Sequence, residues 1–248
     1  MNDILKEIWQ DYETDEFEFN GKEAIIVFAD KSVRTNKWAL KTEYMGAFPE
    51  IEYEFLKNGY NIAYLPNNTR WGSEEDYKNK YEFSKILTEK YGFCEKCAII
   101  GLSCGGLHGI HTAARYPEMV AVMYIDAPVV NLLSCPSHKG WHKDNDKVQD
   151  SWYKEFFSHT GITHSELISQ PIHPINKVPE LVKNNIPIIM AAGDSDVTVP
   201  YIENGALLEK YYKEIGGTIE VIIKEGCDHH PHGLEDNSII VDFIKKYY

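Results

Sequence analysis

The sequence predicts an α/β fold in which a mostly parallel central sheet carries helices on both faces. Two observations predict it: short, nearly continuous apolar runs of strand length recur along the chain, and segments with helical periodicity separate them. A chain of 248 residues has the size of one ordinary domain and can bury a substantial core. We therefore expect a single domain over residues 1–248, without internal repeats.

The expected strands are apolar runs bounded by turn and polar residues. The first two lie on either side of Gly21 and predict a hairpin that leads into the sheet, at 17–20 and 22–29. The strands that follow are expected to be buried, at 60–65, 97–100, 120–125, 186–192 and 218–223.

Three of the expected helices are set by periodicity and by their ends. The helix predicted over 81–91 ends at Gly92, a residue suited to a C-cap. The helix predicted over 203–215 stops before a pair of glycines, and the last helix, over 238–247, places its apolar side chains mostly on one face.

The segment 131–185 interrupts the alternation of strands and helices. It is rich in Trp, His, Ser, Pro and charged residues, and it contains no clear strand. One interpretation is a cap-like insertion over the carboxyl edge of the sheet, where open α/β folds bind ligands. The other is a long connection with two surface helices, and the sequence leaves both open.

Charge and composition exclude several functions. The formal net charge is -13, from 38 acidic and 25 basic residues, which argues against nucleic acid and anionic membranes as partners. No apolar stretch approaches the ~20 residues that span a bilayer, and residues 1–20 do not resemble a secretory signal. Five cysteines suggest no disulfide framework, and Cys94 and Cys97 lack a second pair for zinc. We expect a cytoplasmic protein.

The most informative motif is Gly101-Leu102-Ser103-Cys104-Gly105-Gly106. It directly follows the apolar run that ends at Ile100 and opens a helix predicted over 107–116, which Pro117 stops. A G-x-S-x-G sequence at a strand-to-helix turn is a nucleophile elbow, in which glycines allow strand and helix to approach closely. Ser103 is therefore the candidate nucleophile.

A nucleophilic serine needs an imidazole base and an acid that orients it, in the chain order Ser, Asp or Glu, His. For the acid, Asp196 is favoured, because it follows the strand predicted over 186–192 by a few residues. Asp194 is closer to that strand and can instead hold the turn. Asp126, after another strand, is a third candidate, with a turn aspartate as its simpler interpretation.

For the base, the sequence offers the cluster His229-His230-Pro231-His232 after the last strand. His229 is favoured, because it is the first histidine after the turn that begins at Gly226. His230 and His232 are expected to orient loops or to contact substrate. No helical H-E-x-x-H motif or third set of ligands accompanies them, so we expect no metal.

The oxyanion of a tetrahedral intermediate needs two hydrogen-bond donors. One is expected to be the backbone N–H of Cys104, and the other to come from the segment ADKSVRTNKWALKTEY, which begins at Ala29. Trp38, Trp71 and Trp141 fall in segments expected to be loops near the site, where their rings could bind substrate. Packing in the core or in a loop is the alternative for each of them.

These residues resemble the α/β-hydrolase superfamily over nearly the whole chain. Within it, the chain is similar to a bacterial group found near carbohydrate-active esterases. The matching segments are Trp38, Ser103 to Gly106, Asp126-Ala127-Pro128-Val129, 187–217 and Gly226 to Leu234. Two positions depart from the group, which usually has arginine at Cys104 and at Lys41, so the substrate preference is expected to differ.

The resemblance implies an α/β-hydrolase fold and a serine hydrolase without a cofactor. We expect a carboxylic ester hydrolase that forms an acyl-enzyme, with Ser103 as nucleophile, His229 as base and Asp196 as orienting acid. The expected partner is a small-molecule ester with a short acyl group on a metabolite or carbohydrate, such as an acylated oligosaccharide. The alternatives are a peptidase or thioesterase on the same fold, and a ligand-binding relative without turnover. The oligomeric state stays open.

Overall fold

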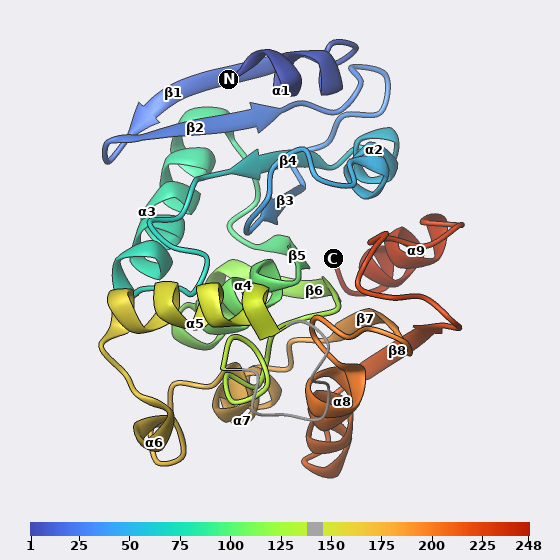
Figure 1. Cartoon of the computed structure of the whole chain (residues 1–248). Helices are drawn as coiled ribbons and strands as arrows, with labels where there is room; N and C mark the ends of the chain where they lie inside the picture. The colour runs from blue at the N-terminus through green and yellow to red at the C-terminus, as the bar shows by residue number, and fades with distance from the viewer. Residues whose placement is uncertain (138–145) are drawn as a thin grey trace.

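The computed structural model describes residues 1–137 and 146–248. Within these residues one sheet runs through the molecule in the strand order β1-β2-β4-β3-β5-β6-β7-β8 (Figure 1). β2 pairs antiparallel with both β1 and β4, and every other neighbouring pair is parallel. The strands are β1 (Thr14–Phe19), β2 (Lys22–Val27), β3 (Trp38–Lys41), β4 (Asn61–Tyr64), β5 (Cys97–Leu102), β6 (Val120–Asp126), β7 (Ile188–Gly193) and β8 (Ile219–Lys224).

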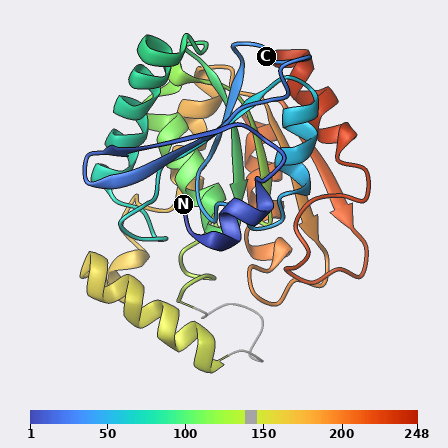
Figure 2. The same cartoon turned by 90° about the horizontal axis from the view of Figure 1, so that it is seen from above.

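Helices cover both faces of this sheet, as Figure 2 shows from above. On one face, α3 (Glu74–Tyr91), α4 (Cys104–Arg115), α7 (Val178–Lys183) and α8 (Gly205–Glu214) bury apolar side chains against the strands. On the other face lie α2 (Glu50–Lys57) and α9 (Ser238–Tyr247). The remaining helices are α1 (Asp3–Ile8), α5 (Asp146–Thr160), α6 (His164–Leu167) and the 3-10 turns η1 (Pro117–Met119), η2 (Pro174–Lys177) and η3 (Tyr201–Glu203). The predicted α/β class is confirmed.

β3 is the strand that the sequence did not predict. It is only four residues long, yet it lies in the middle of the sheet between β4 and β5. It includes Lys41, whose buried ammonium group forms an ion pair with the buried Glu52 on α2. In the sequence, a lysine at the end of so short an apolar run is typical of a loop. Lys41 can be buried in a strand because a helix residue eleven positions later neutralises it, and the local pattern does not reveal this partner.

Two other elements differ from expectation. α3 starts at Glu74, seven residues before the predicted start at 81, because its first half buries polar side chains, among them Asp76 and Lys80. β8 is an edge strand with half-buried and exposed residues, so the expectation of a buried strand over 218–223 is wrong.

The described part of segment 131–185 contains helices and turns, and it adds no strand to the sheet. Its last helix, α7, packs Val178 and Leu181 into the core against the sheet. α5, in contrast, lies apart from the helix layers (Figure 2). In the described residues, no helix has the length and apolar character needed to cross a membrane.

Candidate active site

Ser103 lies in a sharp turn between β5 and α4. Its backbone has φ 53° and ψ -118°, a strained conformation for a residue with a side chain. A Cβ on Gly101 would lie 2.7 Å from the carbonyl oxygen of Gly105, so glycine at 101 is required by the close approach of strand and helix. The turn presents the serine hydroxyl at the carboxyl edge of the parallel strands, as a nucleophile elbow does.

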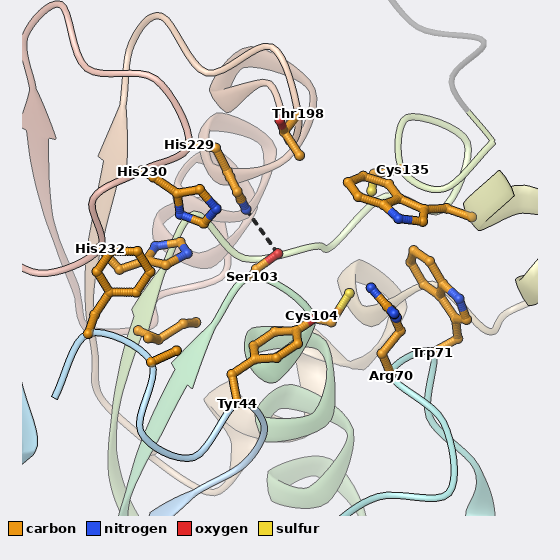
Figure 3. Close-up of a pocket in the computed structure, with 14 residues that line it drawn as sticks. Tyr44, Arg70, Trp71, Ser103, Cys104, Cys135, Thr198, His229, His230 and His232 are labelled. Carbon is orange, nitrogen blue, oxygen red and sulfur yellow. Dashed lines mark hydrogen bonds between the residues drawn. The ribbon is translucent and has the colours of Figure 1, made fainter. Parts of the chain in front are cut away.

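The structure brings the three candidate triad residues together. His229 Nε2 lies 3.1 Å from Ser103 Oγ (Figure 3). On the other side of the ring, His229 Nδ1 lies 2.7 Å from Asp196 Oδ2. The other oxygen of Asp196 accepts the backbone N–H groups of Thr198 at 2.8 Å and Val199 at 2.7 Å. Asp196 and His229 are buried, so these contacts are protected from water. The carboxylate is fixed by its own loop and can orient the imidazole.

The two rival aspartates bind elsewhere. Asp194 accepts the backbone N–H of Gly226 at 2.8 Å and the hydroxyl of Ser195 at 3.0 Å, so it ties the loop after β7 to the loop after β8. Asp126 is fully buried and is contacted by groups from several segments, among them His232 and Lys224. Neither carboxylate is in hydrogen-bond contact with His229 in the structure.

His230 and His232 lie beside His229 and form a histidine cluster with it. His232 Nδ1 lies 3.1 Å from Oδ1 of Asp126, the last residue of β6, although without hydrogen-bond alignment, and the two residues form a second Asp–His pair. Burial lowers the pKa of both His230 and His232, which keeps these rings neutral at pH 7. His230 stacks on Phe48 with ring centroids 5.2 Å apart.

The same three histidines are the described residues that could hold a metal ion. Their ligand atoms lie within 4.8 Å of one another. Tetrahedral zinc with Zn–N bonds of about 2.0–2.1 Å needs nitrogens about 3.4 Å apart. The rings would therefore have to approach each other, and His229 would have to give up its contact with Ser103 or with Asp196.

A cavity of about 520 Å³ opens above Ser103. Its walls are mainly apolar and aromatic, with the histidine cluster at one end. The described residues that line it are Tyr44, Ala47, Phe48, Arg70, Trp71, Leu102, Ser103, Cys104, Cys135, Trp152, Thr198, His229, His230 and His232. It is large enough for a small organic substrate.

Donors for an oxyanion are present beside Ser103. Cys104 is the first residue of α4, where backbone N–H groups have no partner within the helix. The segment expected to supply the second donor contains β3, and its pocket-facing part is the turn after that strand, where Tyr44 lies. Burial, together with the neighbouring Cys104 thiol, raises the pKa of Tyr44, so its hydroxyl keeps its proton and can donate it in a hydrogen bond.

Comparison with known families agrees with this architecture. Residues 58–248 match the prolyl oligopeptidase family, and this range includes Ser103, Asp196 and His229. The chain belongs to the prolyl oligopeptidase family. The geometry of a serine, a histidine and an aspartate at one sheet edge is that of a serine hydrolase site, and the fold is that of α/β-hydrolases.

The mouse acylamino-acid-releasing enzyme is similar to this chain, with 24% identity over 163 residues. The match covers 61% of this chain and 19% of the mouse protein. The chain thus spans about a fifth of that relative. Two archaeal structures share the fold. An acylaminoacyl peptidase from Pyrococcus horikoshii has a TM-score of 0.67 at 13% identity, covering all of this chain and 44% of the peptidase. An esterase from Pyrococcus furiosus has a TM-score of 0.68 at 15% identity, covering 100% of this chain and 96% of the esterase.

The three tryptophans proposed to bind substrate have different positions in this member of the family. Trp71 lines the pocket. Trp38 does not: it is fully buried at the start of β3, stacks on Phe93 and donates its indole N–H to the carbonyl oxygen of Cys94 at 2.8 Å. The expectation that Trp38 contacts substrate is wrong, because the amino end of a parallel strand faces away from the active-site edge. Trp141 lies outside the described residues.

Several pocket residues were missed by the sequence analysis, notably Tyr44, Arg70 and Trp152. Tyr44 and Arg70 follow β3 and β4 at the same edge as Ser103, so the rule that located the triad applies to them as well. Trp152 is on α5, and the sequence contains no signal for the position of that helix relative to the sheet.

Cys104 is expected to be inert despite its place beside the nucleophile. Burial raises the pKa of its thiol to about 12, so only about one molecule in 10⁴ carries a thiolate at pH 8. Iodoacetamide followed by peptide mass mapping should modify the half-buried Cys94 and Cys227 well before Cys104. Rapid modification of Cys104 in the folded protein would contradict this expectation.

Proposed function

We propose that this protein is a serine hydrolase that cleaves carboxylic esters through an acyl-enzyme. The observation that carries the proposal is the continuous contact from Ser103 through His229 to Asp196, at 3.1 and 2.7 Å, at the floor of an apolar pocket. A serine hydroxyl is a poor nucleophile at neutral pH, and this arrangement supplies the base and the orienting carboxylate that it needs.

In the proposed reaction, His229 takes the proton of Ser103 as its oxygen attacks the ester carbonyl. The negative oxygen that forms is stabilised by the backbone N–H of Cys104, and we assign the second hydrogen bond to Tyr44. His229 then gives its proton to the leaving alcohol, and Ser103 keeps the acyl group. Water repeats the sequence with His229 as base, which releases the acid and restores the serine.

Peptide cleavage is the second candidate, and it is supported by the family, by the mouse acylamino-acid-releasing enzyme and by the Pyrococcus horikoshii acylaminoacyl peptidase. The described pocket argues against peptides with a free amino terminus and leaves N-acylated peptides as the candidates of this class. No carboxylate is among the described residues that line it, so an α-ammonium group would have no partner there. The Pyrococcus furiosus esterase covers all of this chain over 96% of its own length, and it supports cleavage of an ester.

The substrate is proposed to be a small ester with a short acyl group on a metabolite or a carbohydrate. The walls of the pocket, with Tyr44, Phe48, Trp71 and Trp152, offer flat apolar surfaces to either. None of the relatives described above is named for action on a carbohydrate. An acylated sugar is therefore screened as one substrate among several ester classes. Thioesters form another, because the same acyl-enzyme chemistry cleaves them.

The deciding experiment is labelling with a fluorophosphonate probe, followed by peptide mass mapping. We expect the wild type to be labelled at Ser103 and His229→Ala to lose the label. The same proteins are then assayed with p-nitrophenyl esters, N-acyl-aminoacyl p-nitroanilides and acyl-CoA. Higher kcat/KM on the esters supports the proposal, and a preference for the anilides would select the peptidase.

Absence of labelling in the wild type would overturn the proposed mechanism and leave a binding protein that retains the triad. Labelling that survives His229→Ala would retain the hydrolase but exclude His229 as its base. His230→Ala and His232→Ala would then be labelled in the same way to find the ring that activates Ser103.

A further inference from the structure

Arg70 is the only permanently charged side chain among the described residues that line the pocket. It follows β4 on the loop that leads to α3, and its guanidinium group points into the cavity between Cys104 and Trp71 (Figure 3). The other described lining groups are aromatic rings, aliphatic chains, thiols, hydroxyls and histidines. A cation in such surroundings attracts an anionic group of a bound molecule.

The structure leaves most of the donors of Arg70 free for a ligand. A guanidinium group has five N–H donors, and the described residues engage it through one contact, from Nε to Glu155 Oε1 at 3.2 Å. The side chains of Arg70 and Glu155 are 39% and 41% exposed, so water weakens this ion pair. Both terminal nitrogens can therefore take a carboxylate in the two-pronged geometry that arginine favours.

The position of Arg70 assigns it to one side of the substrate. His229 must reach the leaving oxygen to protonate it, so the alcohol lies on the His229 side of Ser103. Arg70 lies on the opposite side of Ser103 from His229 (Figure 3). Trp71, Cys135 and Trp152 line the cavity together with Arg70 and give this side apolar walls. The group that reaches Arg70 is thus part of the acyl chain.

We propose that Arg70 forms a carboxylate subsite, so that the enzyme prefers esters whose acyl chain ends in a carboxylate, the half-esters of dicarboxylic acids. This inference rests on the proposed function. The methylene chain would lie along the tryptophans, and the far carboxylate would pair with Arg70. Because the net charge of -13 repels anions, the local cation is what makes such a substrate acceptable.

The test compares esters that differ only in the far end of the acyl chain. Monomethyl succinate, adipate and suberate are paired with methyl butanoate, hexanoate and octanoate, and proton release is followed in a pH-stat at pH 7.5. We expect the best half-ester to have a kcat/KM at least about 10-fold above its uncharged partner. Arg70→Met should lose about 10- to 100-fold on that half-ester and less than about 3-fold on the partner.

Lys210→Met is the matched control, because it removes the same charge from an exposed lysine on α8 that does not line the pocket. It should leave both rates unchanged. Arg70→Lys keeps the charge but loses the two-pronged geometry, and it should recover part of the preference. An equal loss on both esters in Arg70→Met, or a wild type without preference for any half-ester, would overturn the subsite.

A binding measurement separates this inference from the proposed function. Ser103→Ala protein is titrated with adipate, suberate and hexanoate, with heat as the signal. Binding of a dicarboxylate that Ser103→Ala/Arg70→Met loses supports the subsite even if no ester is cleaved. Ester cleavage by the wild type with no dicarboxylate binding would overturn the subsite and leave the hydrolase intact.

Discussion

Asp196→Asn is expected to lower kcat by about 10⁴-fold while the protein stays folded. The asparagine carbonyl can still accept the N–H groups of Thr198 and Val199, which now bind one carboxylate oxygen. Its amide NH₂ would then face His229 Nδ1 and force the proton onto Nε2, the nitrogen that lies 3.1 Å from Ser103. In this tautomer, Nε2 of His229 has no free lone pair with which to accept the serine proton. Stopped-flow acylation with p-nitrophenyl butyrate measures the effect.

Asp194→Asn is the matched control for Asp196→Asn, two positions away on the same loop. Asp194 accepts the backbone N–H of Gly226, and an asparagine oxygen can do the same, so kcat should change by less than about 10-fold. If Asp194→Asn were the variant with the large loss, the acid of the triad would have to be reassigned. Thermal unfolding of both variants checks that the fold is retained.

Asp126→Ala is expected to have the largest effect on stability, a loss of about 3–5 kcal/mol. The carboxylate accepts the Tyr124 hydroxyl at 2.9 Å, the Gly233 N–H at 2.7 Å and the Lys224 ammonium at 3.1 Å. Alanine removes this acceptor from the Tyr124 hydroxyl and the Gly233 N–H, and it leaves the Lys224 ammonium with the carbonyl oxygen of Pro231 at 2.9 Å. Urea unfolding of wild type and variant, followed by circular dichroism, measures the difference.

The exposed Asp242 on α9 supplies the control. Asp242→Ala removes a carboxylate whose side chain is 72% exposed, and it should change the unfolding free energy by less than about 0.5 kcal/mol. A loss below about 1 kcal/mol in Asp126→Ala would show that the buried contacts of Asp126 add little.

The contribution of Asp126 should also depend on pH. Burial raises the pKa of Asp126, but His232, Lys224 and the Gly233 N–H outweigh burial, so the folded pKa lies below the usual value. A carboxyl group whose pKa is lower in the folded state stabilises that state fully above its unfolded pKa of about 3.9. This contribution is lost as the pH falls through the pKa of the folded state. Wild type and Asp126→Ala should therefore differ less at pH 2 than at pH 7.

The sequence predicted the elements whose pattern is local. β5, β6 and β7 are continuous apolar runs, and the elbow and the loops around Asp196 and His229 follow directly from strand ends. These residues lie together because the carboxyl ends of parallel strands share one edge. The fold and the placing of the three triad residues could thus be inferred without tertiary information.

What could not be predicted depends on contacts between distant segments. β3 is held in the sheet by neighbours on both sides, and its Lys41 is acceptable only beside Glu52. Trp38 was wrongly expected in a loop near the active site, because the strand β3 was not predicted. Without that strand, the sequence does not show that Trp38 lies at its amino end. Trp152 reaches the pocket through the packing of α5, on which the side chain of Phe156 is buried with Trp71 and Cys104.

The triad comes from strand ends, whereas much of the opposite wall comes from the 66–73 loop and α5, which Arg70 and Glu155 join by a solvent-exposed ion pair. The nucleophile, the base and the acid thus follow strands of the central sheet. The residues proposed to contact the acyl chain lie on a loop and a helix outside that sheet. In laboratory evolution, mutations of the partly buried Arg70, Trp152 and Glu155 should exchange one substrate for another at little cost in folding. A library directed at 101–106 should yield mostly inactive chains, because a Cβ at Gly101 or Gly106 meets backbone or proline within 3.0 Å.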